Sequence, residues 1–335
     1  MTPPIDASGS VRDLETMFQL LHLRMTAPRK DPQQFAVWKA NFAEQIKNVL
    51  RSPEARYSRE SQAELYKHAA RRTPVEVADL DKVDLDRALA FYKARFGDAS
   101  DFTFVIVGAV DVDKLKPLVA TYLGSLPASG RKEKEKDLGL RKVSGVVKKQ
   151  WHLGQEDKAS VQIDLHADET WTREKERDMF IVGQVLSIKL REVMREDMSG
   201  VYGVGAGGSI QRLPHQERSF SLRFGCAPAR VDELVAAAFA EIDKLAKDGA
   251  SDDYLAKVKQ TFLRNRETEL RTNRFWANWL TTATRVGDDP AMILDSDAIV
   301  ARMTSANVKT AAKKLLDRKQ YYQAVLLPAE APAPK

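Results

Sequence analysis

Two residues that could contact a peptide, Arg195 and Tyr202, stand seven positions apart, just before a glycine-rich run. A guanidinium and a phenol can each donate a hydrogen bond to a peptide carbonyl oxygen, or to the oxyanion that forms when a peptide bond is attacked. The same residue types also have ordinary structural uses, since a cation in the last turn of a helix favours the helix dipole and tyrosine is common in strands. Spacing alone leaves both interpretations open.

The glycines after Tyr202 contain the letters of a G-x-G-x-x-G motif, at Gly203, Gly205 and Gly208. A dinucleotide-binding fingerprint needs a strand before these glycines and a helix after them. Here a helical pattern precedes the glycines and an alternating strand pattern follows, which argues against a nucleotide-binding enzyme. We expect Gly203, Gly205, Gly207 and Gly208 instead to let an extended peptide approach the backbone closely.

The sequence predicts no metal site and no nucleophile. None of the five histidines has another histidine at i+4, so the two-histidine helix face of a zinc peptidase is absent. His166 starts an H-x-x-E tetrapeptide that lacks a second histidine, and we expect it at the surface. Cys226 continues the apolar face that Phe220, Leu222 and Phe224 form on a predicted strand, and it is expected to be a small buried residue. The G-x-S-x-G pattern of a serine nucleophile elbow is also missing.

The elements that would position Arg195 and Tyr202 are clearest in the C-terminal part. Apolar alternation predicts strands at 147–153, 159–166, 201–210, 219–226 and 321–327. Helical spacing predicts helices at 172–195, 231–247, 252–286 and 305–317. Arg195 is thus expected at the end of a helix and Tyr202 at the start of a strand, with a tight turn at Ser199-Gly200 between them.

The N-terminal part repeats the later half of this order. A helix pair over 11–50 is followed by a helix from Asp84 to Phe96 and by a buried strand at 101–108. The stretch FAVWKANF matches LAKVKQTF near residue 255 in register, which indicates an internal duplication whose first copy lacks its front half.

The polar, charged segment 127–148 has the composition of a linker. We therefore predict a partial unit at 1–126 and a complete unit at 149–335, in agreement with the two domains expected for 335 residues.

Composition excludes several classes of protein. With 53 basic and 47 acidic residues the net charge is only +6, and no aromatic-rich basic motif suggests a nucleic-acid partner. A hydrophobic content of 43% is typical of a soluble globular protein. We see no run of apolar residues long enough for a membrane span and no signal peptide at the start MTPPIDASGSVRD.

Four segments carry a resemblance to a known family. They are LLHLRMTAPRKDPQQFAVWK within the first helix pair, the run 85–127, the element LREVMREDMSGVYGVGAG at 190–207, and the segment 231–262. On these segments, which together span nearly the whole chain, the sequence resembles the pitrilysin/insulinase zinc metallopeptidases, and specifically the C-terminal half of the bacterial two-half members. The element at 190–207 is the most specific, because its Arg195 and Tyr202 match a pair kept in that half of the family.

The resemblance implies an α+β fold: two duplicated units, each a mostly antiparallel sheet packed with helices, the first truncated at its N-terminus. Family members have four such units in two halves that close around unfolded peptides. Their zinc is held in the first unit by an H-x-x-E-H helix, and this sequence contains no H-x-x-E-H. Arg195 and Tyr202 would correspond to the residues that reach the substrate and the transition state from the last unit.

The sequence therefore predicts the C-terminal, substrate-enclosing half of a zinc endopeptidase, a hydrolase domain that is inactive alone. The expected partners are the N-terminal zinc-binding half, in the same polypeptide or as a separate subunit, and unfolded peptide substrates; zinc is expected in that other half and no cofactor in this chain. The alternative is a non-catalytic peptide-binding or scaffold subunit of a processing-peptidase-like assembly. The resemblance implies a bacterial, soluble protein, and the compartment stays open, with a periplasmic parent as one alternative.

Overall fold

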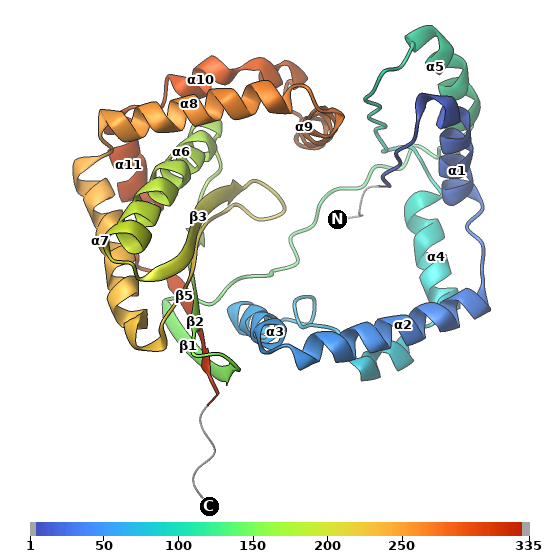
Figure 1. Cartoon of the computed structure of the whole chain (residues 1–335). Helices are drawn as coiled ribbons and strands as arrows, with labels where there is room; N and C mark the ends of the chain where they lie inside the picture. The colour runs from blue at the N-terminus through green and yellow to red at the C-terminus, as the bar shows by residue number, and fades with distance from the viewer. Residues whose placement is uncertain (1–4, 330–335) are drawn as a thin grey trace, which may run out of the picture. The chain divides into compact units, whose positions relative to one another are not determined.

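The computed structural model describes residues 5–329, except the side chains of Asp197 and Tyr202. Its N-terminal elements are helical: η1 (Val11–Asp13), α1 (Leu14–Thr26), α2 (Pro32–Arg51), α3 (Pro53–Leu65), η2 (Val77–Lys82), α4 (Leu85–Phe96), α5 (Val112–Leu118) and η3 (Val119–Leu123). The elements that follow are β1 (Val146–Gly154), β2 (Ala159–Asp168), α6 (Arg173–Leu190), η4 (Arg191–Asp197), β3 (Val201–Gln211), β4 (Glu217–Cys226), η5 (Pro228–Arg230), α7 (Val231–Asp248), α8 (Asp252–Glu269), α9 (Asn273–Val286), η6 (Pro290–Leu294), α10 (Ser296–Val300), α11 (Ser305–Leu315) and β5 (Tyr321–Pro328), as labelled in Figure 1.

The chain forms two compact units, each assembled from separate stretches of sequence. Unit 1 contains Met1–Ile46, Val75–Glu135 and Arg266–Leu294, and unit 2 contains Lys47–Pro74, Lys136–Asn265 and Asp295–Lys335. This grouping reflects proximity in space. The predicted division of the sequence into consecutive units at 1–126 and 149–335 stays a prediction.

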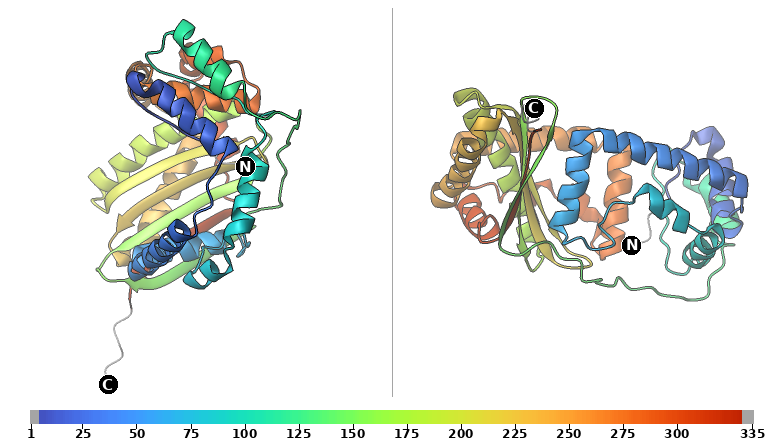
Figure 2. Two further views of the ribbon diagram at one scale, coloured as in Figure 1. Left: turned by 90° about the vertical axis from the view of Figure 1, so that its right-hand side faces the viewer. Right: turned by 90° about the horizontal axis from the view of Figure 1, so that it is seen from below.

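Unit 2 is built on one five-stranded sheet with the strand order β1-β5-β2-β4-β3. The pairs β5–β2, β2–β4 and β4–β3 are antiparallel, and only β1–β5 is parallel. The left view of Figure 2 shows these strands side by side. The α+β class with a mostly antiparallel sheet is thus confirmed.

One face of the sheet, called the helical face below, is covered by α6, α7 and α11 (Figure 1). Alternate residues of β2 and β4, such as Ile163 and Leu222, point into this core and are fully buried. A polar network ties α6 to the start of α11, because the Asp178 carboxylate accepts hydrogen bonds from Arg302 Nε and Nη2 and from Asn307 Nδ2, each at 2.7 Å. A bidentate charged pair of this kind fixes the orientation of a helix as well as its position.

The other face of the sheet, called the opposite face below, carries a smaller apolar cluster where α3 packs on β1 and β5. Figure 2 shows α3 on the side of the sheet away from α7. The Tyr57 hydroxyl of α3 donates to the carbonyl oxygen of Ala324 at 3.0 Å, and the Tyr57 ring meets Trp151 edge to face. Over β2, β4 and β3 this face is mainly polar.

Unit 1 has a small helical core of its own. Phe18 and Met25 of α1 are each 2% exposed, and the Phe18 ring stacks on Tyr122 of η3. Tyr122 also anchors α1 through polar contacts, because its hydroxyl donates to Glu15 Oε1 at 2.9 Å and its carbonyl oxygen lies 2.8 Å from His22 Nδ1. The described part of unit 1 contains no strand.

Two predicted elements are therefore wrong. The apolar residues of 101–108 form no strand, since a strand needs a hydrogen-bonded partner and the described residues of unit 1 supply none. The helix predicted at 252–286 is two helices, α8 and α9, because Thr272 adopts an extended backbone and its hydroxyl caps the second helix by accepting from Phe275 N.

Candidate functional site

Arg195 lies in η4, a short π-helical segment that continues α6. Its side chain is exposed. In a π-helical segment the hydrogen bond reaches one residue further back than in an α-helix, and Met198 N accordingly donates to Val193 O at 3.0 Å. Such segments often mark functional sites because they displace a side chain from the regular helical position. The helix predicted over 172–195 is thus correct in extent but changes its geometry near Arg195.

The turn after η4 brings the chain back towards the helix end. Gly200 N donates to Met194 O at 2.9 Å, and Ser199 has the left-handed backbone angle φ of 46°. A left-handed residue just after a helix end is usually glycine, and Ser199 takes that position here. Arg230 supports the turn by donating from Nη1 to Met198 O at 3.1 Å. The predicted tight turn at Ser199-Gly200 is confirmed.

Gly200 is required at this turn by packing. A Cβ at Gly200 would lie 2.6 Å from Leu234 Cδ2 and 3.1 Å from Arg230 Nη1. The turn therefore presses directly against α7, which fixes where β3 begins.

A second set of contacts holds η4 against α8. The Tyr254 hydroxyl donates a short hydrogen bond to Glu192 Oε2, and Lys257 Nζ lies 3.5 Å from Glu192 Oε1. The hydrogen bond to the Glu192 carboxylate, with burial, raises the pKa of Tyr254 to about 12. Contacts at the Ser199-Gly200 turn and contacts with α8 thus fix the backbone that carries Arg195.

The strand β3 is an edge strand of the sheet, so one side of its backbone has no partner strand among the described residues. Its pairing with β4 shifts register between Val201 and Gly203, which leaves Tyr202 at a bulge. Bulges re-aim side chains and are frequent near active sites. The Tyr202 side chain lies outside the described part of the structure, so the pairing of Tyr202 with Arg195 stays a prediction.

The bulge decides which glycines face outward. Gly203, Gly205 and Gly207 are exposed, and a Cβ added at any of them would meet no described atom within 4 Å. Gly208 faces the other way, because its Cβ would lie 2.6 Å from Met179 Sδ and 2.7 Å from Phe220 Cδ2. Of the glycines expected to contact a peptide, the structure brings Gly203, Gly205 and Gly207 together on the opposite face, and it places Gly208 against the core.

This difference predicts that a glycine-to-alanine substitution changes the free energy of unfolding by different amounts on the two faces. We expect Gly208→Ala to destabilise the protein by about 1–3 kcal/mol, because the added methyl overpacks the core. Gly205→Ala should change the free energy of unfolding by less than about 0.5 kcal/mol, which is typical of an exposed position. Urea unfolding of both variants gives the comparison, and equal destabilisation would contradict the assignment of the two faces.

Polar residues of the opposite face lie in a row across the sheet that ends at the glycines. In register across the sheet lie Tyr322 of β5, Asp164 of β2, Ser221 of β4 and Gly207 of β3. Asp164 is 6% exposed and accepts from Gln162 Nε2 at 2.6 Å. Burial raises the pKa of Tyr322 to about 12, so its hydroxyl stays neutral at ordinary pH.

Two sequence predictions about reactive residues have different outcomes. His166 is only 1% exposed, so the expectation of a surface histidine is wrong. Its ring lies between backbone carbonyl oxygens, with Nδ1 at 3.0 Å from Asp164 O and Nε2 at 2.8 Å from Val143 O, which gives the buried ring its polar partners. Cys226 is fully buried, as predicted, and burial raises the pKa of its thiol.

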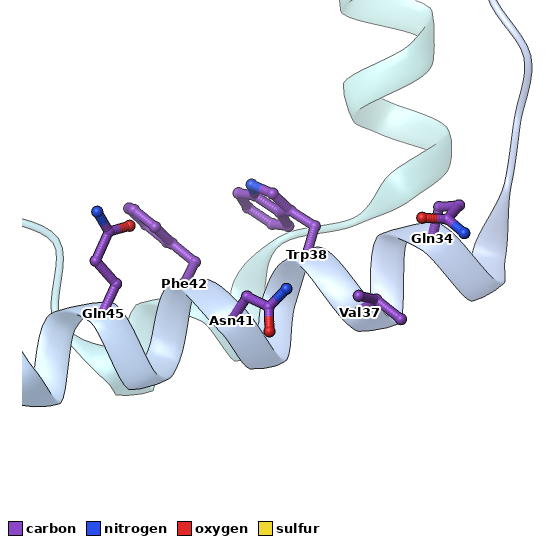
Figure 3. A pocket seen from close by; sticks show the side chains of 6 residues that line it. All are labelled: Gln34, Val37, Trp38, Asn41, Phe42 and Gln45. Carbon is purple, nitrogen blue, oxygen red and sulfur yellow. The ribbon is translucent and has the colours of Figure 1, made fainter.

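Two surface hollows have linings that do not include Arg195. The first, of about 330 Å³, follows α2 in unit 1 and is lined by Gln34, Val37, Trp38, Asn41, Phe42 and Gln45 (Figure 3). These side chains include no acid, base or nucleophile. The second, of about 490 Å³, lies on the helical face between α7 and the strands β1 and β5, and its lining includes Phe239, Tyr321 and Gln323.

Within residues 5–329, no group of three His, Cys, Asp or Glu side chains is arranged to hold a metal ion. No helix in that range is both long enough and apolar enough to cross a membrane. The site around η4 and β3 therefore consists of an exposed guanidinium, an open strand edge and a glycine-lined face. Chemically it can bind an extended peptide backbone and donate hydrogen bonds to carbonyl oxygens.

Comparison with known proteins shows which proteins the chain is similar to. Residues 82–262 match the family model described as peptidase M16 inactive domain. The chain is 28% identical over 336 residues to Probable zinc protease PqqL of Escherichia coli strain K12, and the match covers 98% of the chain but 35% of that protein. It is 24% identical to Zinc protease PQQL-like of Arabidopsis thaliana, covering 79% of the chain and 29% of the relative.

Solved structures give the same result. The periplasmic protease PqqL from Escherichia coli superposes with a TM-score of 0.80 at 26% identity, covering 95% of this chain and 35% of that one. A peptidase M16 inactive domain from Pseudomonas fluorescens, at 16% identity, shares the fold with a TM-score of 0.71, covering 97% and 78%. The chain thus spans about a third of the length of its PqqL relatives. The resemblance to the pitrilysin/insulinase zinc metallopeptidases is confirmed, and the chain belongs to the peptidase M16 inactive-domain family.

Proposed function

We propose that this chain is the substrate-enclosing C-terminal half of a zinc-dependent endopeptidase. Arg195 and Tyr202 bind the peptide and stabilise the oxyanion, and Gly203, Gly205 and Gly207 allow the peptide to approach β3. Gly208 has a structural role in this proposal, because its Cβ position is filled by Met179 and Phe220.

One observation carries the proposal. Arg195 is exposed on a π-helical segment that is fixed by its neighbours and leads through a tight turn into an edge strand with an open glycine face. An extended peptide can add to such an edge through main-chain hydrogen bonds. A guanidinium held at the start of that strand is then close to the carbonyl groups of the added peptide.

Zinc does not fit the described residues of this chain. Its most buried histidine, His166, has both ring nitrogens directed at carbonyl oxygens, and no further acidic or thiol side chains gather around it to complete a ligand set. We therefore place the zinc in a complementary N-terminal half, either in the same polypeptide or in a separate subunit. The substrates in this proposal are unfolded peptides.

The proposed location of the parent protein is the bacterial periplasm. Support comes from the relative in Escherichia coli, which is described as a periplasmic protease.

Reconstitution tests the proposal. The chain is mixed with the zinc-bearing half encoded with it, and cleavage of a quenched, unstructured peptide is followed. We expect neither half to cleave the peptide at a substantial rate alone, and the mixture to do so until a chelator removes the zinc. A mixture no more active than the zinc-bearing half would contradict a role of this chain in catalysis.

The second candidate function is a non-catalytic peptide-binding or scaffold subunit. An H-x-x-E-H motif encoded next to this chain would favour the peptidase half, and a neighbouring sequence without that motif would favour the binding subunit. The reconstitution experiment also separates the two, because a binding subunit retains peptide affinity in a fluorescence titration while adding nothing to the rate of cleavage.

A further inference from the structure

Arg223 is a cation of the opposite face that the sequence did not single out. It lies on β4 between Leu222 and Phe224, whose side chains enter the core, so its own side chain projects to the opposite face and is exposed. The sheet register places it directly between Gly205 of β3 and Gln162 of β2.

The positive charge of Arg223 is not neutralised by a neighbour. Among the described residues, its guanidinium has no hydrogen bond and no ion pair. The carboxylate nearest in register on the same face, Asp164, is hydrogen-bonded to Gln162. The charge of Arg223 nevertheless acts on Tyr57. Burial raises the pKa of the Tyr57 hydroxyl, Tyr322 and Asp164 raise it further, and Arg223 lowers it.

A second polar group of the same column also lacks a partner. The Ser221 hydroxyl, two positions before Arg223 on the same face, is shielded from solvent and has no hydrogen-bond partner. A buried polar atom without a partner costs free energy that a ligand can recover. Ser221 and Arg223, next to the glycines on β4, are therefore two hydrogen-bond donors without an acceptor among the described residues.

The glycines decide what these donors can reach. Neighbouring strands lie about 4.8 Å apart, so a peptide added to the free edge of β3 lies about 10 Å from β4. A side chain at position 205 would stand between Arg223 and that peptide, but Gly205 has none and its Cβ position is open. The long arginine side chain can thus extend across β3 towards an acidic side chain of the peptide.

We propose that Arg223 selects peptides that carry an aspartate or glutamate at the position facing Gly205. This inference rests on the proposed binding of extended peptides along β3 and adds their substrate class. A guanidinium and a carboxylate form a charge-assisted, potentially bidentate pair, which is stronger than the contact with a neutral amide of the same shape.

The test compares two short fluorescein-labelled peptides that differ only in a central glutamate or glutamine. Fluorescence anisotropy with the full 335-residue chain should give about two- to fivefold tighter binding of the glutamate peptide. The preference should weaken as salt is raised, because the pair is exposed to solvent. In Arg223→Gln the preference should disappear while the glutamine peptide binds as before.

A matched control removes one positive charge from the helical side of the sheet instead. Lys247 is exposed on α7, which covers the helical face, so Lys247→Gln should keep the full preference. The reversed pair, Arg223→Glu with a central lysine in the peptide, should restore a preference of opposite sign.

The outcomes separate this inference from the proposed function. Equal binding of both peptides by the unmodified chain, or a preference that survives Arg223→Gln, would overturn the assignment to Arg223 and leave peptide binding along β3 intact. If neither peptide binds, the proposed peptide-binding role of this chain and the selection by Arg223 are both wrong.

Discussion

Replacing Tyr202 by phenylalanine should lower the turnover number of the reconstituted peptidase by about 10²- to 10³-fold, the usual cost of removing one oxyanion donor. The substitution removes only the phenolic hydroxyl, so a loss of this size would identify the hydroxyl as the group that acts on the transition state. In the proposed role the hydroxyl contributes most when negative charge develops on the carbonyl oxygen, so KM should change less than the turnover number.

Stability provides the control for this experiment. The backbone of Tyr202 lies at a bulge on an edge strand, and the substitution keeps the aromatic ring. We therefore expect the melting temperature of Tyr202→Phe to match that of the unmodified chain. Unchanged turnover in the variant would exclude the assigned role, and a lowered melting temperature together with lost turnover would point to a structural effect instead.

Replacing Phe220 by alanine should destabilise the chain by about 3–5 kcal/mol, the range for large cavities in well-packed cores. Phe220 is fully buried on β4 and stands opposite Leu165 and Gly208 in the register. Its ring lies against the positions where Cβ atoms of Gly208 and Gly183 would be, so neither glycine can fill the space that the ring leaves. The midpoint of urea unfolding measures the loss.

The matched control is Phe180→Ala on α6. Phe180 is 38% exposed and contacts Phe262 only at the ring edge, with ring centroids 5.9 Å apart. Phe180→Ala should lower the free energy of unfolding by roughly 1 kcal/mol or less, since removing a partly exposed ring leaves little buried cavity. A similar loss in both variants would contradict the placement of Phe220 at the centre of the core.

The strands around the site could be predicted because each buries one face. In 159–166 and 219–226 apolar and polar residues alternate, and the buried side chains of β4 follow this alternation. In β2 the apolar positions are buried as expected, but Asp164 and His166 are buried as well. The same reasoning failed for 101–108, where the apolar residues are present but no neighbouring strand pairs with them. Apolar composition predicts burial, whereas a strand also requires a partner for its backbone.

The buried state of His166 could not be predicted for a related reason. Its partners are the carbonyl oxygens of Asp164 and Val143, and the latter lies in a segment with no regular pattern of its own. Polar side chains are buried where the fold supplies acceptors for them, and local sequence does not contain that information.

The sequence by itself determined the α+β class, the family and the order of elements that carry Arg195 and Tyr202. Alternation, helix capping and the spacing of that pair are local properties, so they can be read along the chain. Only the tertiary structure decided which face each glycine of β3 occupies. The register shift at Val201 and Gly203 directs Gly203, Gly205 and Gly207 outward and Gly208 into the core, because one extra residue in a strand exchanges its two faces. The neighbours of Arg223 likewise depend on strand pairing, which joins residues distant in sequence.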